Sequence, residues 1–265
     1  MLAVCATPIG NLDDVTLRVL AELRVADVVL CEDTRRTRTL LARHGIEARL
    51  LSYHRHNEAA RTAELLPRLA DGERIALVSD AGLPGVNDPG ARLIAAALER
   101  GMAVTVLPGP SAVETALVAS GLVGERYQFL GYLPRRPGEL DALWRELASW
   151  PHAAVAFESP QRLATSLGSL AAALPVRQVA VCRELTKRFE EVVRGTAVEL
   201  AARFAEGARG EITLVLGAAE AGPDEARAGE AVAELLAAGL PRKQAAELVA
   251  RLTGVPRNRL YRASL

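Results

Sequence analysis

Short apolar runs alternate with helix-like segments along most of the chain, and this alternation restricts the fold more than any other feature. The first pair is an apolar run at 2–6 and an amphipathic segment at 14–24, where hydrophobic residues recur every three or four positions. The runs are almost wholly apolar, as in strands covered by helices on both faces. The pattern predicts an α/β fold built on a parallel sheet. Further strands are expected at 27–31, 74–79 and 103–107, and further helices at 37–44, 58–70, 91–100 and 112–120.

Similar segments recur with a different spacing after residue 121, which indicates a second α/β domain. The chain has 265 residues, enough for two domains, and we expect these at 1–121 and 122–217. A small-residue segment with Gly and Pro at 218–223 predicts a linker. In the second domain, strands are expected at 127–133, 153–157, 179–183 and 211–216, and helices at 139–149, 161–174 and 196–206.

The tail at 224–265 has a different character, because helical patterns follow one another without strands. Helices are expected at 224–238, 241–253 and 256–264. The whole chain has 32 basic and 32 acidic residues, yet residues 242–265 hold six basic residues and one acid, Glu247. A helix–turn–helix tail with this charge favours a phosphate-backbone partner. A solvated helical tail that only packs on the body is the alternative.

The composition excludes several classes of protein. The three cysteines lie far apart without a CxxC pair, so neither a disulfide framework nor a zinc ribbon is predicted. There is no HExxH motif, and we expect no metal. The first seven residues carry no side-chain charge and no run of 18 apolar residues occurs, so we predict a cytoplasmic protein without a membrane anchor.

Three Gly- and Pro-containing loops follow predicted strands of the first domain, at 7–11, 79–85 and 108–111. Ligands bind beyond the carboxyl ends of strands in open parallel sheets, so we expect these loops to line one cleft. The sequence has no GxGxxG motif, and neither of its two lysines follows a glycine, which excludes the usual dinucleotide fingerprint and the P-loop. Ser111 lacks the GxSxG context of a hydrolase nucleophile.

Several strings of the sequence occur together, in order, in one known group of enzymes. They are TPIGN at 7–11, CEDTR at 31–35, VSDAGLPGVNDPG at 78–90, LPGPSA at 107–112, FESP at 157–160, RELTK at 183–187 and Arg194-Gly195. With these strings the chain resembles the tetrapyrrole-methylase superfamily, and within it the ribosomal RNA small-subunit methyltransferase I family. The resemblance runs from about residue 2 to residue 216, and the basic tail is also similar.

The resemblance implies a two-domain class III S-adenosylmethionine methyltransferase with a small helical tail. It implies S-adenosylmethionine in the cleft between the domains, a homodimer, and 2′-O-methylation of a cytidine in 16S rRNA of the small ribosomal subunit. The cofactor-binding residues carried over by the matching strings are Pro8, Ser79, Asp80, Ala81, Ser111, Ala112, Phe157, Glu158, Leu185, Ile212 and Thr213.

A ribose hydroxyl is a weak nucleophile, so a base or a cation near the developing alkoxide would assist its methylation. Asp33, Glu158, Glu184 and Lys187 are the candidates for these roles. Lys187 is one of only two lysines, which suggests that a compact ammonium is wanted there. The expected RNA contacts are Arg35, Arg36, Arg38, Arg55, Arg135, Arg136, Arg257 and Arg259.

Two other functions remain open at this point. A protein with the same fold and cofactor could methylate a tetrapyrrole or another small molecule, although the arginine cluster at 35–38 and the basic tail count against this. A non-enzymatic RNA-binding protein would have no affinity for S-adenosylmethionine.

Overall fold

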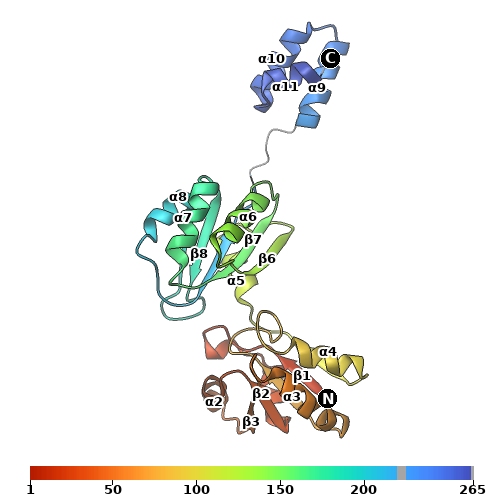
Figure 1. The fold of residues 1–265 in the computed structure, drawn as a ribbon, viewed down its shortest axis with the longest axis vertical. Helices are drawn as coiled ribbons and strands as arrows, with labels where there is room; N and C mark the ends of the chain where they lie inside the picture. Colours follow the sequence, from red (N-terminus) through yellow and green to blue (C-terminus); the bar gives the residue numbers. More distant parts are fainter. Residues whose placement is uncertain (220–224, 264–265) are drawn as a thin grey trace.

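The computed structural model describes residues 1–219 and 225–263, and two sheet-containing units form most of it (Figure 1). The first sheet has the strand order β3-β2-β4-β1-β5, and all neighbouring strands are parallel. Its strands are β1 (Leu2–Cys5), β2 (Val28–Cys31), β3 (Leu50–Ser52), β4 (Ile75–Val78) and β5 (Val104–Leu107). The predicted α/β fold with a parallel sheet is therefore confirmed.

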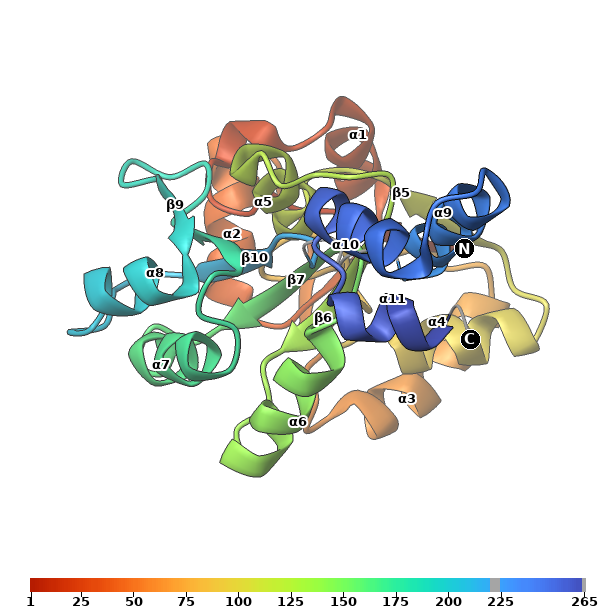
Figure 2. The same ribbon diagram turned by 90° about the horizontal axis from the view of Figure 1, so that it is seen from above.

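Helices cover both faces of the first sheet, which explains why its strands are apolar throughout. In β1, Ala3 and Cys5 face one core, whereas Leu2 and Val4 face the other. Successive side chains of a strand point to opposite faces, so each strand supplies both cores. Helices α1 (Leu17–Val25) and α2 (Thr34–Arg43) close the first core, and α3 (Glu58–Ala70) and α4 (Ala91–Glu99) close the second (Figure 2).

The second sheet is mixed, with the order β6-β7-β10-β8-β9. Only β6 and β7 are parallel, and the other neighbours are antiparallel. Its strands are β6 (Tyr127–Tyr132), β7 (Ala153–Glu158), β8 (Gln178–Arg183), β9 (Glu191–Thr196) and β10 (Ile212–Leu216). One face packs around the buried Trp144 beneath α6 (Pro137–Leu147), α7 (Leu163–Ala173) and α8 (Ala197–Arg203).

Helix α5 (Ala112–Ser120) covers the other face of the second sheet. Its Val113, Ala116 and Leu117 pack against Val155 and Val215 of that sheet. We expected the first domain to end at residue 121, which would have placed this helix with the first sheet. The packing instead assigns α5 to the second unit, because its apolar face is buried there. The chain thus crosses between the units at 108–111.

Two strands and several helix starts differ from the expectations; α1, for example, begins at Leu17 rather than at residue 14. The three-residue β3 and the sheet-edge strand β9 were not predicted, because neither is a long apolar run. Helix α2 begins at Thr34 rather than at residue 37. The Asp33 carboxylate accepts a hydrogen bond from the Arg35 backbone N–H and thereby caps the helix one turn earlier.

The tail forms three helices with an apolar core of their own (Figure 1). They are α9 (Glu225–Ala237), α10 (Arg242–Thr253) and α11 (Arg257–Ala263), close to the predicted ranges. Val232, Val249 and Leu260 are almost fully buried among them. Most of the expected linker lies outside the described residues. Within the described ranges, no helix is both long and apolar enough to cross a bilayer.

A tight contact joins the two units at the loop after β1. Gly10 lies against the turn that follows β8, and a Cβ atom there would stand 2.8 Å from the Leu185 carbonyl oxygen and 2.5 Å from Cγ of Lys187. The Asn11 backbone N–H donates to Oγ1 of Thr186 at 2.9 Å. Ile9 packs into the same core as Leu185. Only glycine permits so close an approach.

We predict that Gly10→Ala lowers the free energy of unfolding by about 1–3 kcal/mol, because the added methyl group overpacks this contact. Urea denaturation followed by circular dichroism measures the change. The control is Gly138→Ala, where a Cβ would meet nothing within 4 Å. Equal stability of the two variants would show that the contact tolerates a side chain.

Candidate functional site

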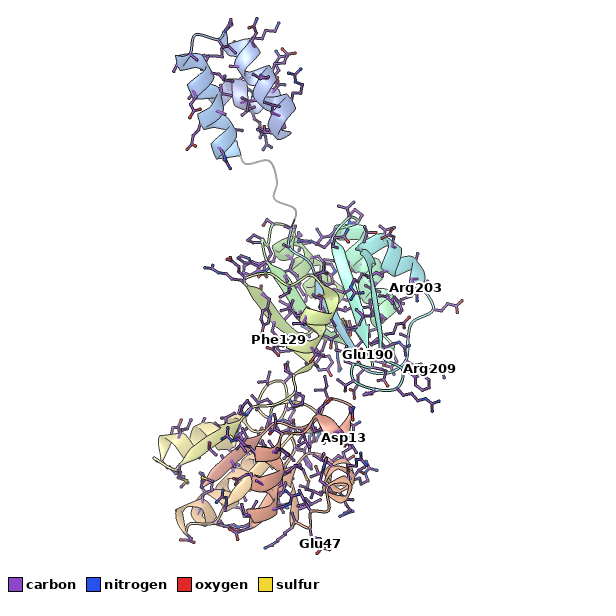
Figure 3. All side chains as sticks on the ribbon, turned by 180° about the vertical axis from the view of Figure 1, so that it is seen from behind. Asp13, Glu47, Phe129, Glu190, Arg203 and Arg209 are labelled. Carbon is purple, nitrogen blue, oxygen red and sulfur yellow. The ribbon has the colours of Figure 1, made fainter. Side chains whose placement is uncertain are left out.

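A cleft with a volume of about 650 Å³ lies between the two units. The loops after β4 and β5 line it from the first unit, and β6, the end of β7 and the segment 210–213 line it from the second. Figure 3 places Phe129 and Glu190 at the end of the second unit that faces the first, whereas Glu47 lies at the far end of the first unit. The carboxyl ends of the parallel strands therefore open toward the second unit, as the sequence predicts.

A smaller pocket of about 300 Å³ shares a wall with this cleft. The shared wall consists of Ile9, Arg36, Asp80, Ala81 and Glu211. The smaller pocket reaches the start of α2 and Lys187. The two hollows thus form one continuous site with a larger and a smaller chamber.

The structure brings the residues expected at the cofactor together. Pro8 and Ser79 line the smaller chamber, and Asp80 and Ala81 line both. The larger chamber also contains Ser111, Ala112, Phe157, Glu158, Leu185, Ile212 and Thr213. These residues come from the loops after β1, β4 and β5, the start of α5, strands β7 and β10, and the turn after β8, so their proximity depends on the fold rather than on the sequence spacing.

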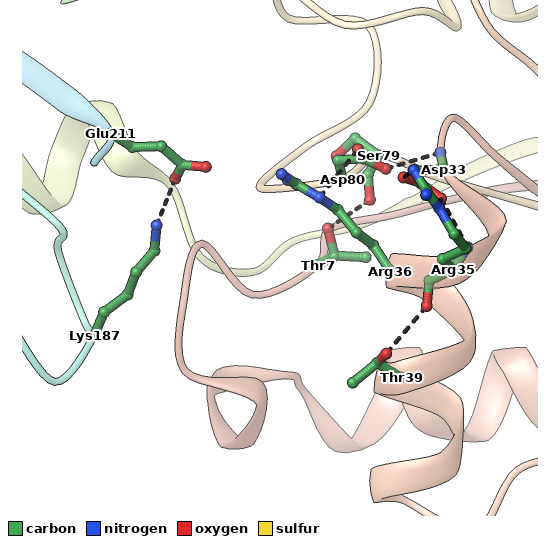
Figure 4. A network of polar contacts seen from close by, with 9 residues as sticks. All are labelled: Thr7, Asp33, Arg35, Arg36, Thr39, Ser79, Asp80, Lys187 and Glu211. Carbon is green, nitrogen blue, oxygen red and sulfur yellow. Dashed lines mark hydrogen bonds and ion pairs between the residues drawn. The ribbon is translucent and has the colours of Figure 1, made fainter. Parts of the chain in front are cut away.

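Hydrogen bonds fix the loops after β1 and β4 to each other. Thr7 and Gly82 exchange backbone hydrogen bonds at 2.8 and 3.0 Å. The Thr7 hydroxyl donates to the Ser79 carbonyl at 3.0 Å, and the Ser79 hydroxyl donates to the Gly82 carbonyl at 2.9 Å. Figure 4 shows Thr7 and Ser79 beside Asp80. Backbone hydrogen bonds and these two hydroxyl groups therefore fix the floor of the site.

The larger chamber carries an excess of acidic groups. One cation, Arg36, lies in its lining, all of which falls within residues 1–219. The carboxylates in the same lining are Asp80, Asp88, Glu114, Glu158 and Glu211. An acidic cleft with low-dielectric walls favours a cationic ligand.

Asp80 is held in place by two groups from the segment that enters α2. The Asp33 backbone N–H donates to its Oδ1 at 3.0 Å, and Nε of Arg36 lies 3.7 Å from its Oδ2 (Figure 4). Asp33 itself does not line either chamber. Its carboxylate forms a bidentate pair with Arg35, whose hydrogen bonds lower the pKa of Asp33 to about 2. Such a group is a poor proton acceptor at neutral pH.

Glu158 lines the larger chamber, but its side chain is fully buried. It accepts a hydrogen bond from the Ser159 backbone N–H at 2.7 Å and another from the Ser166 hydroxyl. Arg162 lies 3.3 Å from the same carboxylate. These partners account for both oxygens, so Glu158 holds the end of β7 to the start of α7.

Lys187 and Glu184 form a charged cluster with Glu211. Nζ of Lys187 lies 2.8 Å from Glu184. It also lies 3.0 Å from Glu211, a contact drawn in Figure 4. Burial opposes the charge of Lys187, but its two hydrogen bonds outweigh burial and raise its pKa. The Lys187 hydrogen bond and the Glu211 backbone N–H lower the pKa of Glu184. Glu184 and Thr186 have φ angles of 53° and 64°, a left-handed conformation that this turn keeps at a cost in strain.

Sequence reasoning missed Asp88 as a functional candidate. It lies on the wall of the larger chamber, in the loop between β4 and α4. Burial, with smaller contributions from Glu32 and Asp80, raises the pKa of Asp88 to about 6. The only signal in the sequence is its position inside the string VSDAGLPGVNDPG, which does not distinguish it from Asp80.

The arginines expected to contact RNA are all exposed. Arg36 lines both chambers, whereas Arg35 pairs with Asp33 and Arg136 pairs with Glu139. The remaining members of this set are Arg38, Arg55, Arg135, Arg257 and Arg259. Of these arginines, Arg36 is the one that lines a chamber of the site. Among the described residues, no group of three or more His, Cys, Asp and Glu side chains could hold a metal ion.

Two family models and several named relatives match this chain. The model of the tetrapyrrole (corrin/porphyrin) methylases matches residues 1–201, and that of the RsmI C-terminal HTH domain matches residues 222–265. A protein from Mesorhizobium japonicum named ribosomal RNA small subunit methyltransferase I is 45% identical over 267 residues, covering 100% of this chain and 91% of the relative. The chain belongs to the ribosomal RNA small subunit methyltransferase I family. A Mycobacterium bovis member is 44% identical over 268 residues, covering 100% of this chain and 94% of its own.

Solved structures agree on the fold of this methyltransferase family. A diphthine synthase superposes with a TM-score of 0.64 at 16% identity, covering 82% of this chain and 89% of its own. A Thermus thermophilus uroporphyrin-III C-methyltransferase complexed with S-adenosylhomocysteine superposes with a TM-score of 0.58 at 18% identity. The match covers 82% of this chain and 96% of that one. The class III methyltransferase fold predicted from the sequence is thereby confirmed.

We predict that Glu158→Gln lowers the free energy of unfolding by about 1–3 kcal/mol, because the amide cannot accept from all of the present donors. The urea midpoint measures this loss. Glu139→Gln, which alters the exposed pair with Arg136, should change the free energy of unfolding by less than about 1 kcal/mol. An unchanged midpoint for Glu158→Gln would contradict its structural role and return it to the catalytic candidates.

Proposed function

We propose that this chain transfers a methyl group from S-adenosylmethionine to the ribose 2′-hydroxyl of a cytidine in 16S rRNA. Its relatives are named for methylation of small-subunit ribosomal RNA. The observation that carries the proposal is the acid-lined cleft, because the methyl donor bears a sulfonium and an ammonium group. The cytidine target and the 2′-oxygen rest on the motif resemblance described above.

The residues present fit this donor. A chamber of about 650 Å³ is in the range of small-molecule sites, which span roughly 300–1,000 Å³. Ile9, Leu185 and Ile212 supply apolar walls, and Phe157 adds an aromatic one. The loops at 80–83 and 108–111 line the same space. Asp80 would face the donor's ammonium group, with Arg36 free to exchange partners.

The donor supplies a reactive sulfonium methyl, and the protein must orient the ribose hydroxyl toward it. Orientation alone accounts for much of the rate in such displacements. Lys187 lines the smaller chamber as a charged ammonium held by two carboxylates. In that position it would stabilise negative charge on the ribose oxygen. Its raised pKa makes it unsuited to accept the proton.

RNA would approach along the arginines of the chamber rim and the basic tail. Contacts to phosphates position RNA without reading its sequence. The acidic larger chamber repels a phosphate backbone, so the nucleotide would enter through the smaller chamber, where Arg36 and Lys187 lie. The homodimer implied by the resemblance stays part of this proposal, and sedimentation of the purified protein would test it.

Methyl incorporation from labelled S-adenosylmethionine separates the proposal from its alternatives. The account expects label in 30S subunits or 16S rRNA, mapped by mass spectrometry to a 2′-O-methylcytidine. Label in a precorrin but not in RNA would favour a small-molecule methyltransferase. No binding of the donor by calorimetry would leave only an RNA-binding protein.

We predict that Asp80→Ala weakens binding of S-adenosylmethionine about tenfold, since loss of one favourable charge contact costs about 1.4 kcal/mol. Titration calorimetry measures the dissociation constant. The control is Asp71→Ala, at the exposed end of α3 away from both chambers. An unchanged affinity in Asp80→Ala would place the ammonium group elsewhere.

We further predict that replacing Arg257 and Arg259 together with Gln makes RNA binding less dependent on salt. The slope of the logarithm of affinity against the logarithm of salt concentration should become shallower by about 1–2, because fewer counterions are released. Replacing Arg92 of α4 and Arg100, which follows that helix, with Gln makes a control of equal charge. Identical slopes in the two double variants would mean that the tail does not contact phosphates.

A further inference from the structure

The ribose hydroxyl loses its proton as it is methylated, and the two chambers restrict which group can accept that proton. On the proposed function the nucleotide enters through the smaller chamber, so the acceptor must line that chamber. Among the residues that the structure describes, two carboxylates do so, Asp80 and Glu211, and both belong to the wall that the chambers share. Asp88 and Glu158 line only the larger chamber, and Glu184 lines neither.

Asp80 already has partners of its own. Its Oδ1 accepts the Asp33 backbone N–H at 3.0 Å, and Nε of Arg36 lies 3.7 Å from its Oδ2. On the proposed function, the charge of Asp80 also holds the donor's ammonium group. If Asp80 took the ribose proton, it would lose that charge while the donor is bound. Glu211 is therefore the remaining acceptor in the smaller chamber.

Glu211 has one carboxylate oxygen that the folded chain does not use. Its Oε2 accepts a hydrogen bond from Nζ of Lys187 at 3.0 Å, whereas its Oε1 has no hydrogen-bond or ion-pair partner within residues 1–219 and 225–263. Figure 4 shows one oxygen of Glu211 turned toward Lys187 and the other turned away from it. The side chain is 58% exposed, so both a substrate and water can reach the free oxygen.

The main chain holds Glu211 in this place. The Glu184 backbone N–H donates to the Glu211 carbonyl at 3.0 Å, and the Glu211 backbone N–H donates to Oε1 of Glu184 at 2.9 Å. Gly210, just before it, has a φ angle of 89°, and a Cβ there would stand 2.5 Å from the Glu184 side chain. Glycine is thus required at 210, and the carboxylate of Glu211 extends from a fixed backbone.

Lys187 is placed to assist a proton transfer to Glu211. Glu184 and Glu211 share its single positive charge, so the cluster carries one negative charge more than it needs for neutrality. Lys187 and Glu211 both line the smaller chamber. When Glu211 takes up a proton, the ion pair between them weakens, and the charge of Lys187 becomes available to the ribose oxygen.

We infer that Glu211 is the catalytic base, which accepts the proton of the ribose 2′-hydroxyl on Oε1 during methyl transfer. This inference rests on the proposed function. The bond between the ribose oxygen and the methyl carbon forms as the carbon–sulfur bond breaks, and the electron pair of the broken bond stays on sulfur. The O–H electron pair remains on oxygen, and its proton passes to Glu211. Water then removes this proton from the exposed carboxyl, which restores the pair with Lys187.

The first test measures binding rather than catalysis. The full-length protein, saturated with S-adenosylhomocysteine, is titrated with two 16S rRNA fragments that differ only at the target nucleotide, cytidine or 2′-deoxycytidine. The wild type should bind the cytidine fragment about tenfold more tightly, because the hydroxyl donates a hydrogen bond to a charged group. Glu211→Ala should bind both fragments equally. Glu206→Ala, an exposed acid between α8 and β10 that lines neither chamber, should keep the preference. An undiminished preference in Glu211→Ala would overturn the inference.

The second test measures methylation of 30S subunits. Glu211→Gln should lower kcat by about 10²–10⁴-fold with little change in KM, because its amide oxygen still accepts a hydrogen bond but cannot take the proton. Added formate should restore part of the activity of Glu211→Ala and none of that of Lys187→Ala. Glu206→Gln should react at the wild-type rate. A wild-type kcat in Glu211→Gln would overturn the inference while leaving the proposed function intact, and failure of the wild type to methylate any RNA would overturn both.

Discussion

The contact between Gly10 and the turn at 184–187 is the constraint on which the site depends. The first sheet delivers its loops to one edge, but these loops form only half of a chamber. The absence of a side chain at Gly10 allows the turn after β8 to approach the loop after β1 within van der Waals distance. That approach brings Leu185 to the wall of the larger chamber and Lys187 to the smaller one. Both chambers therefore depend on this junction for part of their walls.

The two chambers differ in the charged residues that line them. The larger has five carboxylates in its lining against one arginine, which suits a sulfonium donor and disfavours phosphates. The smaller contains Arg36 and Lys187, each balanced by a carboxylate that also borders the larger chamber. The two sides of the shared wall therefore favour ligands of opposite charge, although the chain as a whole has no net charge. On this account, the donor and the nucleotide meet where the chambers join.

The sequence predicts the elements of this fold better than it predicts which charged residues are chemically available. The apolar strands and the helices that cover them follow from local patterns, so 58–70 and 112–120 match α3 and α5. Strands β3 and β9 escape such patterns, because pairing with a neighbour at the sheet edge stabilises them more than their own composition does. The same limit explains the assignment of α5 to the second unit, which only its packing against β10 and β8 determines.

Local sequence patterns predict the state of the site residues even less well than they predict the sheet-edge strands. The loops at 7–11, 79–85 and 108–111 could be placed at one edge from the order of the strands alone. The state of an acid could not, because it depends on neighbours distant in the chain. Asp33 and Asp88 have equal prominence in the motifs, yet one is paired with Arg35 and the other is half-buried beside Glu32 and Asp80. Only the folded chain distinguishes a carboxylate that caps a helix and pairs with an arginine from one that lines the larger chamber.

The most direct measurement of the central claim is a crystal structure of the protein with S-adenosylhomocysteine. The account predicts that this product occupies the larger chamber, with its ammonium group at Asp80 and its adenosine against Phe157 and the segment 211–213. A product bound outside that chamber, or a chamber filled by protein side chains at saturating product, would contradict it.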